Sequence, residues 1–190
     1  MDTIAALPLR SNDVVVLPSG YRAVVQPITP AAKPLIAAGV ARLSPTSSRR
    51  RFFTPRVSLS ERELDTLTRV DGVRHYAFGL CGRGADGAVE GIAAARFVRL
   101  PDDPGAAEIA LTVIDDHQGQ GLGKLMLGRL AAAALVRGVL RLRGLIVPDN
   151  APMIGLLRKY APFARFRYDG DVYTADIAVP QLAASLPAAA

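Results

Sequence analysis

The pattern of apolar and polar positions is clearest over residues 108–137, where three consecutive elements can be read. Residues 109–114 alternate between two faces and include several β-branched side chains, which predicts a strand. Residues 115–117 are polar and break the alternation. Over residues 122–134 apolar side chains recur at steps of three and four, as on one face of a helix. The stretch therefore predicts a strand, a glycine-rich turn and a helix in succession.

The rest of the chain reads as further strands and helices joined by turn residues. Strands are predicted over residues 14–17, 21–28, 75–81, 88–100, 140–147, 163–168 and 172–179. Helices are predicted over residues 30–43, 60–68 and 151–160. Ser60 and Glu63 have the spacing of a capping box, and Ser44-Pro45 opens either a turn or a further helix.

The order of these elements predicts an α/β (α+β) fold. Three strands in a row, the last at 108–114, are joined by turns at 82–87 and 101–105, so we expect them to pair antiparallel. The strand, turn, helix and strand over residues 108–147 predict a right-handed parallel crossover. We therefore expect a mixed, mostly antiparallel sheet with this crossover at its centre and helices flanking it.

Length and composition favour one domain. The chain has 190 residues, half of them hydrophobic, which is enough for a core of its own. We expect the domain over residues 21–179, an extension over 1–20 and a frayed tail over 180–190. No apolar run reaches the length of a membrane span, and the first ten residues lack the layout of a signal peptide.

Cys81 is the sole cysteine, so no disulfide can form within the chain, as is usual in a reducing cytoplasm. It is either a nucleophile or a plain strand residue. His75 and His117 are the two histidines that could serve it as a base.

The charge is basic, with 23 Lys and Arg against 17 Asp and Glu, a net charge of +6. Such a surface favours anionic partners: the phosphates of a small molecule, an acidic protein face or nucleic acid. No nucleic-acid-binding module is recognisable, so we expect no nucleic-acid partner. The run Arg49-Arg50-Arg51 is either a solvated basic face or a guide for an acidic partner.

The glycine-rich turn has a chemical use. The first N–H groups of a helix lack partners within it and attract a phosphate, and glycines let that anion approach. Lys124 adds a positive charge. A Walker loop is excluded because Gln118 stands where its first glycine belongs, and the dinucleotide fingerprint fails because its last glycine would fall on Lys124. The alternative is a turn that merely reverses the chain.

A third phosphate-binding pattern fits. Gln118-x-x-Gly121-x-Gly123, between a strand and a helix, resembles the acetyl-CoA signature of the GNAT N-acetyltransferases. Residues 107–110 and 113–119 look like the bacterial protein-lysine acetyltransferase branch of that family. Residues 44–53 are similar to a segment that lies near the acceptor side in that branch. The resemblance covers residues 21–179 and implies a GNAT fold.

The resemblance implies acetyl-CoA as cosubstrate and no metal. Backbone N–H groups at the end of the central strand would hold the pantetheine arm and the thioester oxygen, and those of the turn would hold the pyrophosphate. Asn150 matches an asparagine that touches the cofactor arm in many members, and it also suits a helix cap. The expected cofactor-binding residues are Val113, Ile114, Gln118, Gly119, Gln120, Gly121, Leu122, Gly123, Lys124 and Asn150.

Acetylation of an amine needs a base, because the attacking nitrogen must be neutral. Glu108 is the candidate, at the start of the apolar strand that leads to the turn, and the resemblance implies this role. In a partly apolar cleft the pKa of its carboxyl would rise. The alternative is a solvated glutamate at a strand end. Asp115 and Asp116 suit the role less, since they would lie beside the phosphates and repel them.

A proton donor for the departing CoA thiolate is less clear. Many members carry a tyrosine about seven residues after the asparagine, where this chain has Leu157. Tyr160 stands one helical turn further on a similar face and is the candidate acid. It is otherwise a core or capping residue, and the thiolate can leave without a side-chain acid.

These residues support two classes of function. The first is an N-acetyltransferase that moves the acetyl group directly from acetyl-CoA to a primary amine, with a protein lysine as the favoured acceptor and a small amine as the alternative. The second is a non-catalytic acetyl-CoA-binding regulatory module. We expect a cytoplasmic monomer or homodimer with no membrane partner.

Overall fold

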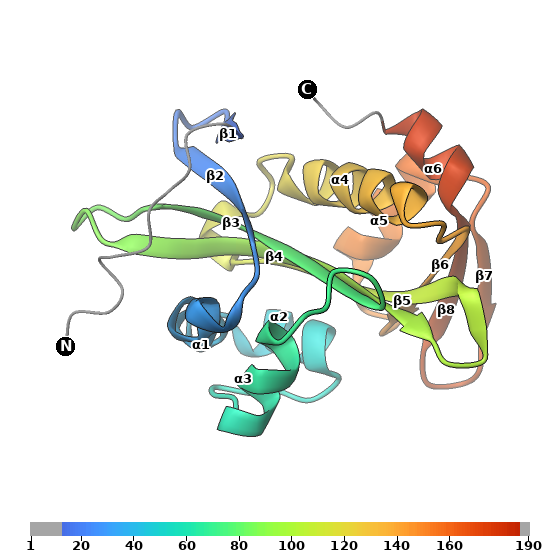
Figure 1. The fold of residues 1–190 in the computed structure, drawn as a ribbon, viewed down its shortest axis with the longest axis horizontal. Helices are drawn as coiled ribbons and strands as arrows, with labels where there is room; N and C mark the ends of the chain where they lie inside the picture. The colour runs from blue at the N-terminus through green and yellow to red at the C-terminus, as the bar shows by residue number, and fades with distance from the viewer. Residues whose placement is uncertain (1–12, 187–190) are drawn as a thin grey trace. The chain divides into compact units, whose positions relative to one another are not determined.

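The computed structural model describes residues 13–186 and divides the chain into two compact units (Figure 1). Among the described residues the first unit comprises residues 13–71, 77–94 and 112–122. The second comprises residues 72–76, 95–111 and 123–186. The predictions for residues 1–12 and 187–190 therefore lie outside the described part of the chain.

The described strands form a sheet with the hydrogen-bonded order β1-β2-β3-β4-β5-β6-β8-β7. β5 and β6 run parallel, whereas β1–β2, β2–β3, β6–β8 and β7–β8 run antiparallel. This confirms the predicted mixed, mostly antiparallel sheet with a parallel crossover. The strands are β1 Val14–Val16, β2 Arg22–Pro27, β3 His75–Arg83, β4 Val89–Leu100, β5 Asp103–Val113, β6 Arg141–Ile146, β7 Arg165–Tyr168 and β8 Tyr173–Ala178.

Three of the described helices begin after a residue whose side chain caps them. The α-helices are α1 Lys33–Ala41, α2 Pro45–Phe52, α3 Glu61–Thr68, α4 Leu122–Val136, α5 Ala151–Tyr160 and α6 Val179–Ser185. Two 3-10 turns, η2 Pro30–Ala32 and η3 Asp115–His117, precede α1 and α4. Ser60 and Glu63 form the predicted capping box at α3. Ser44 caps α2, so the segment after α1 is a helix rather than a turn.

In the first unit, α1, α2 and α3 lie on one side of its strands (Figure 1). Part of its core is a cluster of Leu35 from α1, Cys81 from β3 and Val89 from β4. Leu35 and Val40 of α1 and Leu64 of α3 are buried, so each helix turns an apolar face towards the core.

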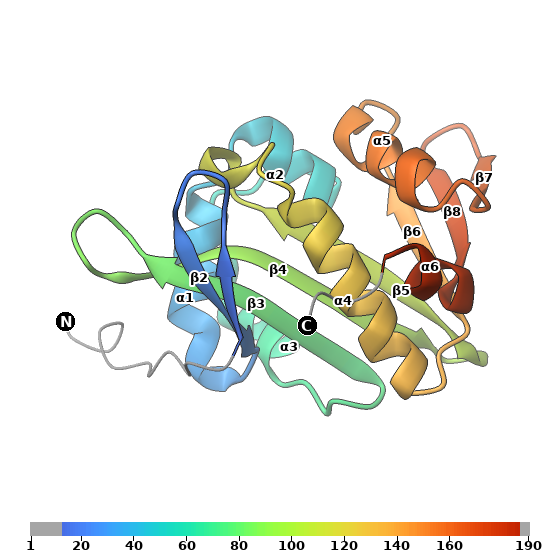
Figure 2. The ribbon, with the colours of Figure 1, turned by 90° about the horizontal axis from the view of Figure 1, so that it is seen from above.

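In the second unit, α4 lies over β5 and the second half of β4 (Figures 1 and 2). The helix is buried on more than one face, which its run of alanines permits. β6 and β8 each bury every second residue against the core of this unit, which is the alternation expected of half-exposed strands. Their buried residues include Leu142, Ile146, Ala175 and Ile177.

The structure differs from the sequence prediction at two element boundaries. β5 begins at Asp103, inside the stretch expected to be a turn, because Leu140 N–H donates to Gly105 O (2.8 Å) and Arg141 pairs with Asp103. The expectation of a frayed tail is wrong up to residue 185, where α6 is helical. Val179, Leu182 and the following Leu186 are 0–2% exposed, so one helical face supplies apolar burial that holds the segment.

Candidate active site

The glycine-rich turn belongs to the first unit as far as Leu122, where α4 begins. Gly119 and Gly121 have φ angles of +72° and +83°, and a Cβ atom on either would meet nothing within 4 Å. Glycine is therefore required at these two positions by the left-handed backbone conformation and not by close packing. The geometry is that of a tight turn whose outer side is open where the helix begins.

Gly123 serves a different purpose, in the second unit. A Cβ atom there would lie 3.4 Å from Leu156 Cδ2 on α5. The third glycine of the signature thus allows the first turn of α4 to approach α5. Two glycines set the backbone of the turn and the third sets helix packing.

Side chains of the turn tie it to other parts of the first unit. Gln118 Nε2 donates to Val113 O (3.0 Å) and to Ser47 Oγ (3.3 Å), which joins the turn to the end of β5 and to α2. Gln120 Oε1 accepts a hydrogen bond from Ser19 Oγ (2.6 Å). The signature glutamine therefore fixes the entry of the turn, and Gln120 fixes its middle.

The end of β5 offers fewer free donors than expected. Ile114 N–H already donates to Ile92 O (3.0 Å). Ile114 O accepts from His117 N–H (2.9 Å), which closes η3. Of the two residues expected to meet the pantetheine arm, Val113 is therefore the better candidate.

Asp115 has a structural role that the sequence did not reveal. Its carboxylate accepts hydrogen bonds from Ser44 N–H (3.1 Å), Ser44 Oγ (2.7 Å) and Ser47 Oγ (2.8 Å). Burial alone would raise the pKa of Asp115, but these hydrogen bonds outweigh it and hold the pKa below the usual 3.8. The residue thus connects η3 to the N-terminus of α2, where a negative charge is favourable.

A second polar cluster supports η3 from the residue before β2, the residue after α1 and a residue of β4. Glu90 accepts from Tyr21 OH (2.8 Å) and pairs with Arg42, which also reaches Asp116 Oδ2 at 3.3 Å. Burial, and then the bond to Glu90, raise the pKa of Tyr21 well above its usual 10. His117 is 8% exposed, with Nε2 at 3.8 Å from Glu90. Sequence reasoning missed this cluster, whose members are far apart in the chain.

In the second unit, Lys124 and Tyr160 meet. The Lys124 ammonium lies 5.5 Å from the centre of the Tyr160 ring, and Lys159 lies 5.3 Å from it. Asn150 is the N-cap of α5, with Oδ1 accepting from Met153 N–H at 3.2 Å. The capping interpretation of Asn150 is therefore confirmed, and a contact with the cofactor arm stays a prediction.

Glu108 stands exposed on β5, next to Arg143 in the parallel register with β6. Within residues 13–186 its carboxylate has neither an ion pair nor a hydrogen bond. The sequence led us to expect a partly apolar cleft, because the flanking residues of the strand are apolar. Those neighbours, Ala107 and Ile109, turn to the buried face instead.

Cys81 is buried on β3 in the first unit. Burial raises the pKa of the Cys81 thiol to about 11, so little thiolate exists at neutral pH. It packs with Leu35 and Val89. These surroundings match a plain strand cysteine rather than a nucleophile.

None of the helices within residues 13–186 is long and apolar enough to cross a membrane. No group of three or more His, Cys, Asp or Glu side chains in this part of the chain could hold a metal ion.

Comparison with known proteins identifies the class of protein that this fold and turn define. Residues 48–161 match the model of the acetyltransferase (GNAT) family, which is more than half of the chain. The chain belongs to the GNAT family of acetyltransferases, in which acetyl-CoA is the typical acetyl donor. The resemblance of the Gln118–Gly123 signature is thereby confirmed.

Particular relatives are bacterial acetyltransferases called Pat. Acetyltransferase Pat of Mycolicibacterium smegmatis is 40% identical over 90 residues, 47% of this chain and 26% of the relative. The crystal structure of the GNAT domain of S. lividans PAT has a TM-score of 0.75 and 28% identity, covering 87% of this chain and 95% of that one. A cAMP-binding acyltransferase from Mycobacterium smegmatis has a TM-score of 0.60 and 28% identity, covering 92% of this chain and 48% of that one.

Proposed function

We propose that this acetyltransferase moves the acetyl group of acetyl-CoA directly to the side-chain amine of a protein lysine. The observation that carries the proposal is the turn before α4, where two left-handed glycines leave open space. Similarity to the GNAT domain of S. lividans PAT, over most of both chains, supports acetyl transfer. The match to Pat itself spans about a quarter of that relative.

Acetyl-CoA would bind along the turn. Gln118 N–H already donates to Asp115 O (3.1 Å), so the backbone N–H groups of residues 119–124 would hold the pyrophosphate at the start of α4, and Lys124 would add a positive charge nearby. Val113 N–H would hold the pantetheine arm and the thioester oxygen, and Asn150 would contact the arm with its remaining amide N–H groups.

Transfer would proceed in one displacement. The neutral amine attacks the thioester carbon, a C–N bond forms, the C–S bond breaks and CoA leaves as a thiolate. Glu108 would take the proton that the amine loses, directly or through water. Tyr160 would donate a proton to the thiolate. Because Cys81 is buried and its thiol stays protonated at neutral pH, an acetyl-enzyme intermediate is not part of the proposal.

The test is incubation with labelled acetyl-CoA and a panel of proteins and small amines, read for acetylated product and for free CoA thiol. Acetylated lysine in proteins, with matching thiol release, would support the proposal. Label in small amines alone would favour a small-molecule acetyltransferase. Tight acetyl-CoA binding with no product would favour a regulatory module. We further propose a cytoplasmic location and a monomer or homodimer, without a nucleic-acid partner.

A further inference from the structure

A row of alternating charges crosses four strands of the second unit. Backbone register aligns Glu108 of β5 with Arg143 of β6, Arg143 with Asp176 of β8, and Asp176 with Arg165 of β7. Residues paired in register project from the same face of a sheet. The candidate base therefore shares one face with two arginines and an aspartate. Burial agrees, since the residues flanking Arg143 and Asp176 in their strands are buried.

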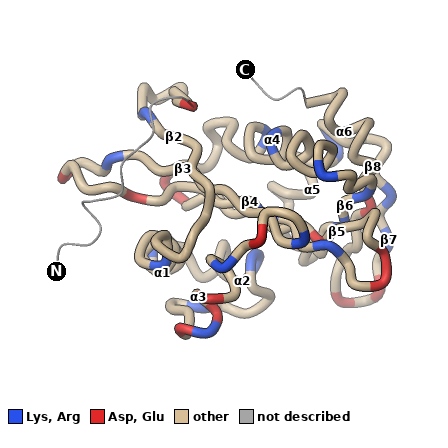
Figure 3. The backbone as a smooth tube through the Cα atoms, in the orientation of Figure 1, with Lys and Arg blue, Asp and Glu red and all other residues tan. Residues whose placement is uncertain are grey.

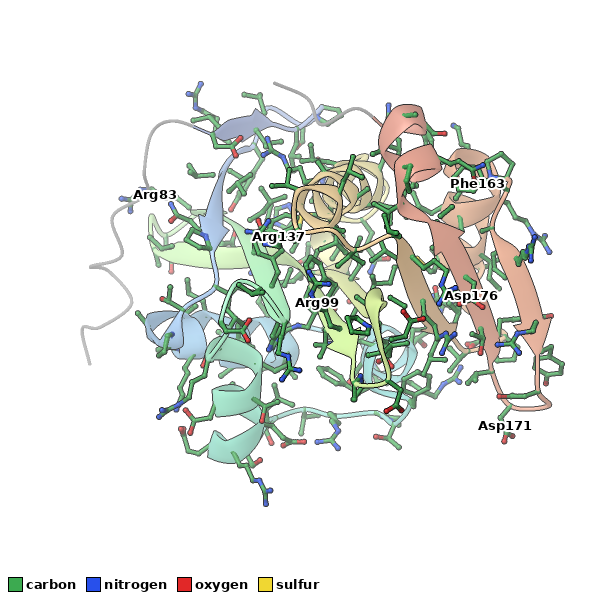
Figure 4. The ribbon with its side chains drawn as sticks, turned by 45° about the vertical axis from the view of Figure 1, so that its right-hand side comes forward. Arg83, Arg99, Arg137, Phe163, Asp171 and Asp176 are labelled. Atoms are coloured by element: carbon green, nitrogen blue, oxygen red, sulfur yellow. The ribbon has the colours of Figure 1, made fainter. Side chains whose placement is uncertain are left out.

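Three of these residues line a pocket of about 550 Å³ in the same unit. Figure 4 labels two of its lining residues, Asp176 on β8 and Phe163 ahead of β7. Arg141, two residues before Arg143 on β6, also lines it. Figure 3 shows basic residues on β6 and β7. Three arginines against one aspartate make this a positively charged pocket with an apolar wall at Phe163.

Some charged side chains of the pocket form ion pairs with other residues of the described chain, and one does not. Asp176 is held by Arg143, with Nε at 3.1 Å from Oδ1, and by Arg167, with Nη2 at 3.8 Å from Oδ2. Arg141 pairs with Asp103. Within the described chain the Arg165 guanidinium has no ion pair and no hydrogen bond, and its side chain is exposed. Because Asp176 is already paired with Arg143 and Arg167, Arg165 is free to bind an external anion.

We propose that this pocket binds a carboxylate of the acceptor protein, an Asp or Glu close in sequence to the lysine that is acetylated. The inference rests on the proposed function, because it places the reacting lysine amine beside Glu108. A guanidinium fork recognises a carboxylate by paired hydrogen bonds, and Phe163 suits the apolar stem of the acidic side chain.

The geometry specifies the spacing. Neighbouring strands lie about 4.8 Å apart, so Arg143 is one spacing from Glu108 and Arg165 is three spacings, about 14 Å, away. An extended acceptor segment advances about 3.3 Å per residue. The pocket would therefore select an acidic residue about two to four positions from the acceptor lysine.

The experiment compares three peptides with one lysine each and with Glu, Gln or Arg three positions away. The parent should acetylate the Glu peptide about fivefold more efficiently (kcat/KM) than the Gln peptide, and the Arg peptide least. Arg165→Gln should remove this preference through KM, leaving kcat for the Gln peptide unchanged. Arg165→Glu should reverse the preference, and 1 M salt should weaken it in the parent.

Arg62→Gln is the matched control, because it removes the same charge from the exposed surface of α3. It should leave the preference intact. Equal rates with all three peptides in the parent, or a preference that Arg165→Gln leaves unchanged, would overturn the pocket assignment while the transferase stands. No transfer by the parent to any peptide or protein would overturn the proposed function, and this inference with it.

Discussion

Glu108 is an exposed carboxylate with an arginine next to it in register, rather than a carboxyl enclosed by apolar side chains. A carboxylate acts as a base only on an amine that comes within hydrogen-bonding reach. Its suitability as a base therefore depends on where the acceptor amine binds. Substitution tests this role without disturbing the core, because the side chain has no ion pair or hydrogen bond within residues 13–186.

We expect Glu108→Gln to retain acetyl-CoA binding and to reduce turnover by roughly a hundredfold, the usual scale for a lost base. The loss should shrink at high pH, where more of the amine is already neutral. Cys81→Ala should have little effect on turnover. A pH–rate profile of the parent and both variants checks this, and full activity of Glu108→Gln beside an inactive, folded Cys81→Ala would contradict the mechanism.

Phe53 is a residue under backbone strain at the end of α2. It is the one non-glycine residue of the described chain with a positive φ, +65°, and its side chain is 44% exposed. Glycine suits this left-handed C-cap, whereas any Cβ costs about 1 kcal/mol. Both Phe53→Gly and Phe53→Ala lose the ring, so we expect the Gly variant to unfold at higher urea than the Ala variant. Equal stabilities of the Gly and Ala variants would contradict backbone strain at residue 53.

At the scale of elements, the turn before α4 provides the most direct test of cofactor binding. Gly121→Glu places a negative charge where the pyrophosphate is expected and should greatly weaken acetyl-CoA binding, as measured by calorimetry. Gly87→Glu is the matched control: it has φ +78°, lies in the β3–β4 connection and also has open space around its Cβ position. The Gly87→Glu variant carries the same backbone strain and should bind acetyl-CoA as tightly as the parent. Equal affinity in both folded variants would exclude the turn as the site.

The link between η3 and α2 makes a prediction about pH. The pKa of Asp115 is lower in the folded chain than in an unfolded one, where it is about 3.9. The stabilisation is therefore present above about pH 4 and is lost as the pH falls through the folded pKa. Asp115→Asn should be less stable than the parent near pH 7 in urea unfolding, and the difference should narrow below pH 4. A difference that stays constant with pH would show that the carboxylate charge contributes nothing.

At the scale of the whole molecule, α6 is an integral part of the second unit. Leu182 on this helix is 0% exposed, so Leu182→Ala should lower the free energy of unfolding by about 2–5 kcal/mol. Leu140→Ala makes the same chemical change at a site that is 56% exposed and should cost less than about 1 kcal/mol. Urea unfolding distinguishes them. If both variants match the parent, the C-terminal segment frays as its composition suggested.

Many elements could be predicted because their signals are local. The alternation over residues 109–114, the Ser60–Glu63 capping box and the helical period after Leu122 each involve residues within one turn or a few positions of one another. The extent of α6 was missed since its alanine-rich sequence has little pattern, and its helix depends on burial of Val179 and Leu182. The start of β5 was missed because pairing with the chain before β6 overrides the turn residues.

The sequence by itself determined the strand, the left-handed glycine turn and the helix of the acetyl-CoA signature, because backbone preferences and side-chain period act within short stretches. Only the tertiary structure decided which distant residues support them. Asp115 meets Ser44, and Glu108 enters a charged row ending at Arg165, through strand register and helix packing. These contacts join residues tens of positions apart, and register is set by how whole strands bury their apolar faces, which no local pattern encodes.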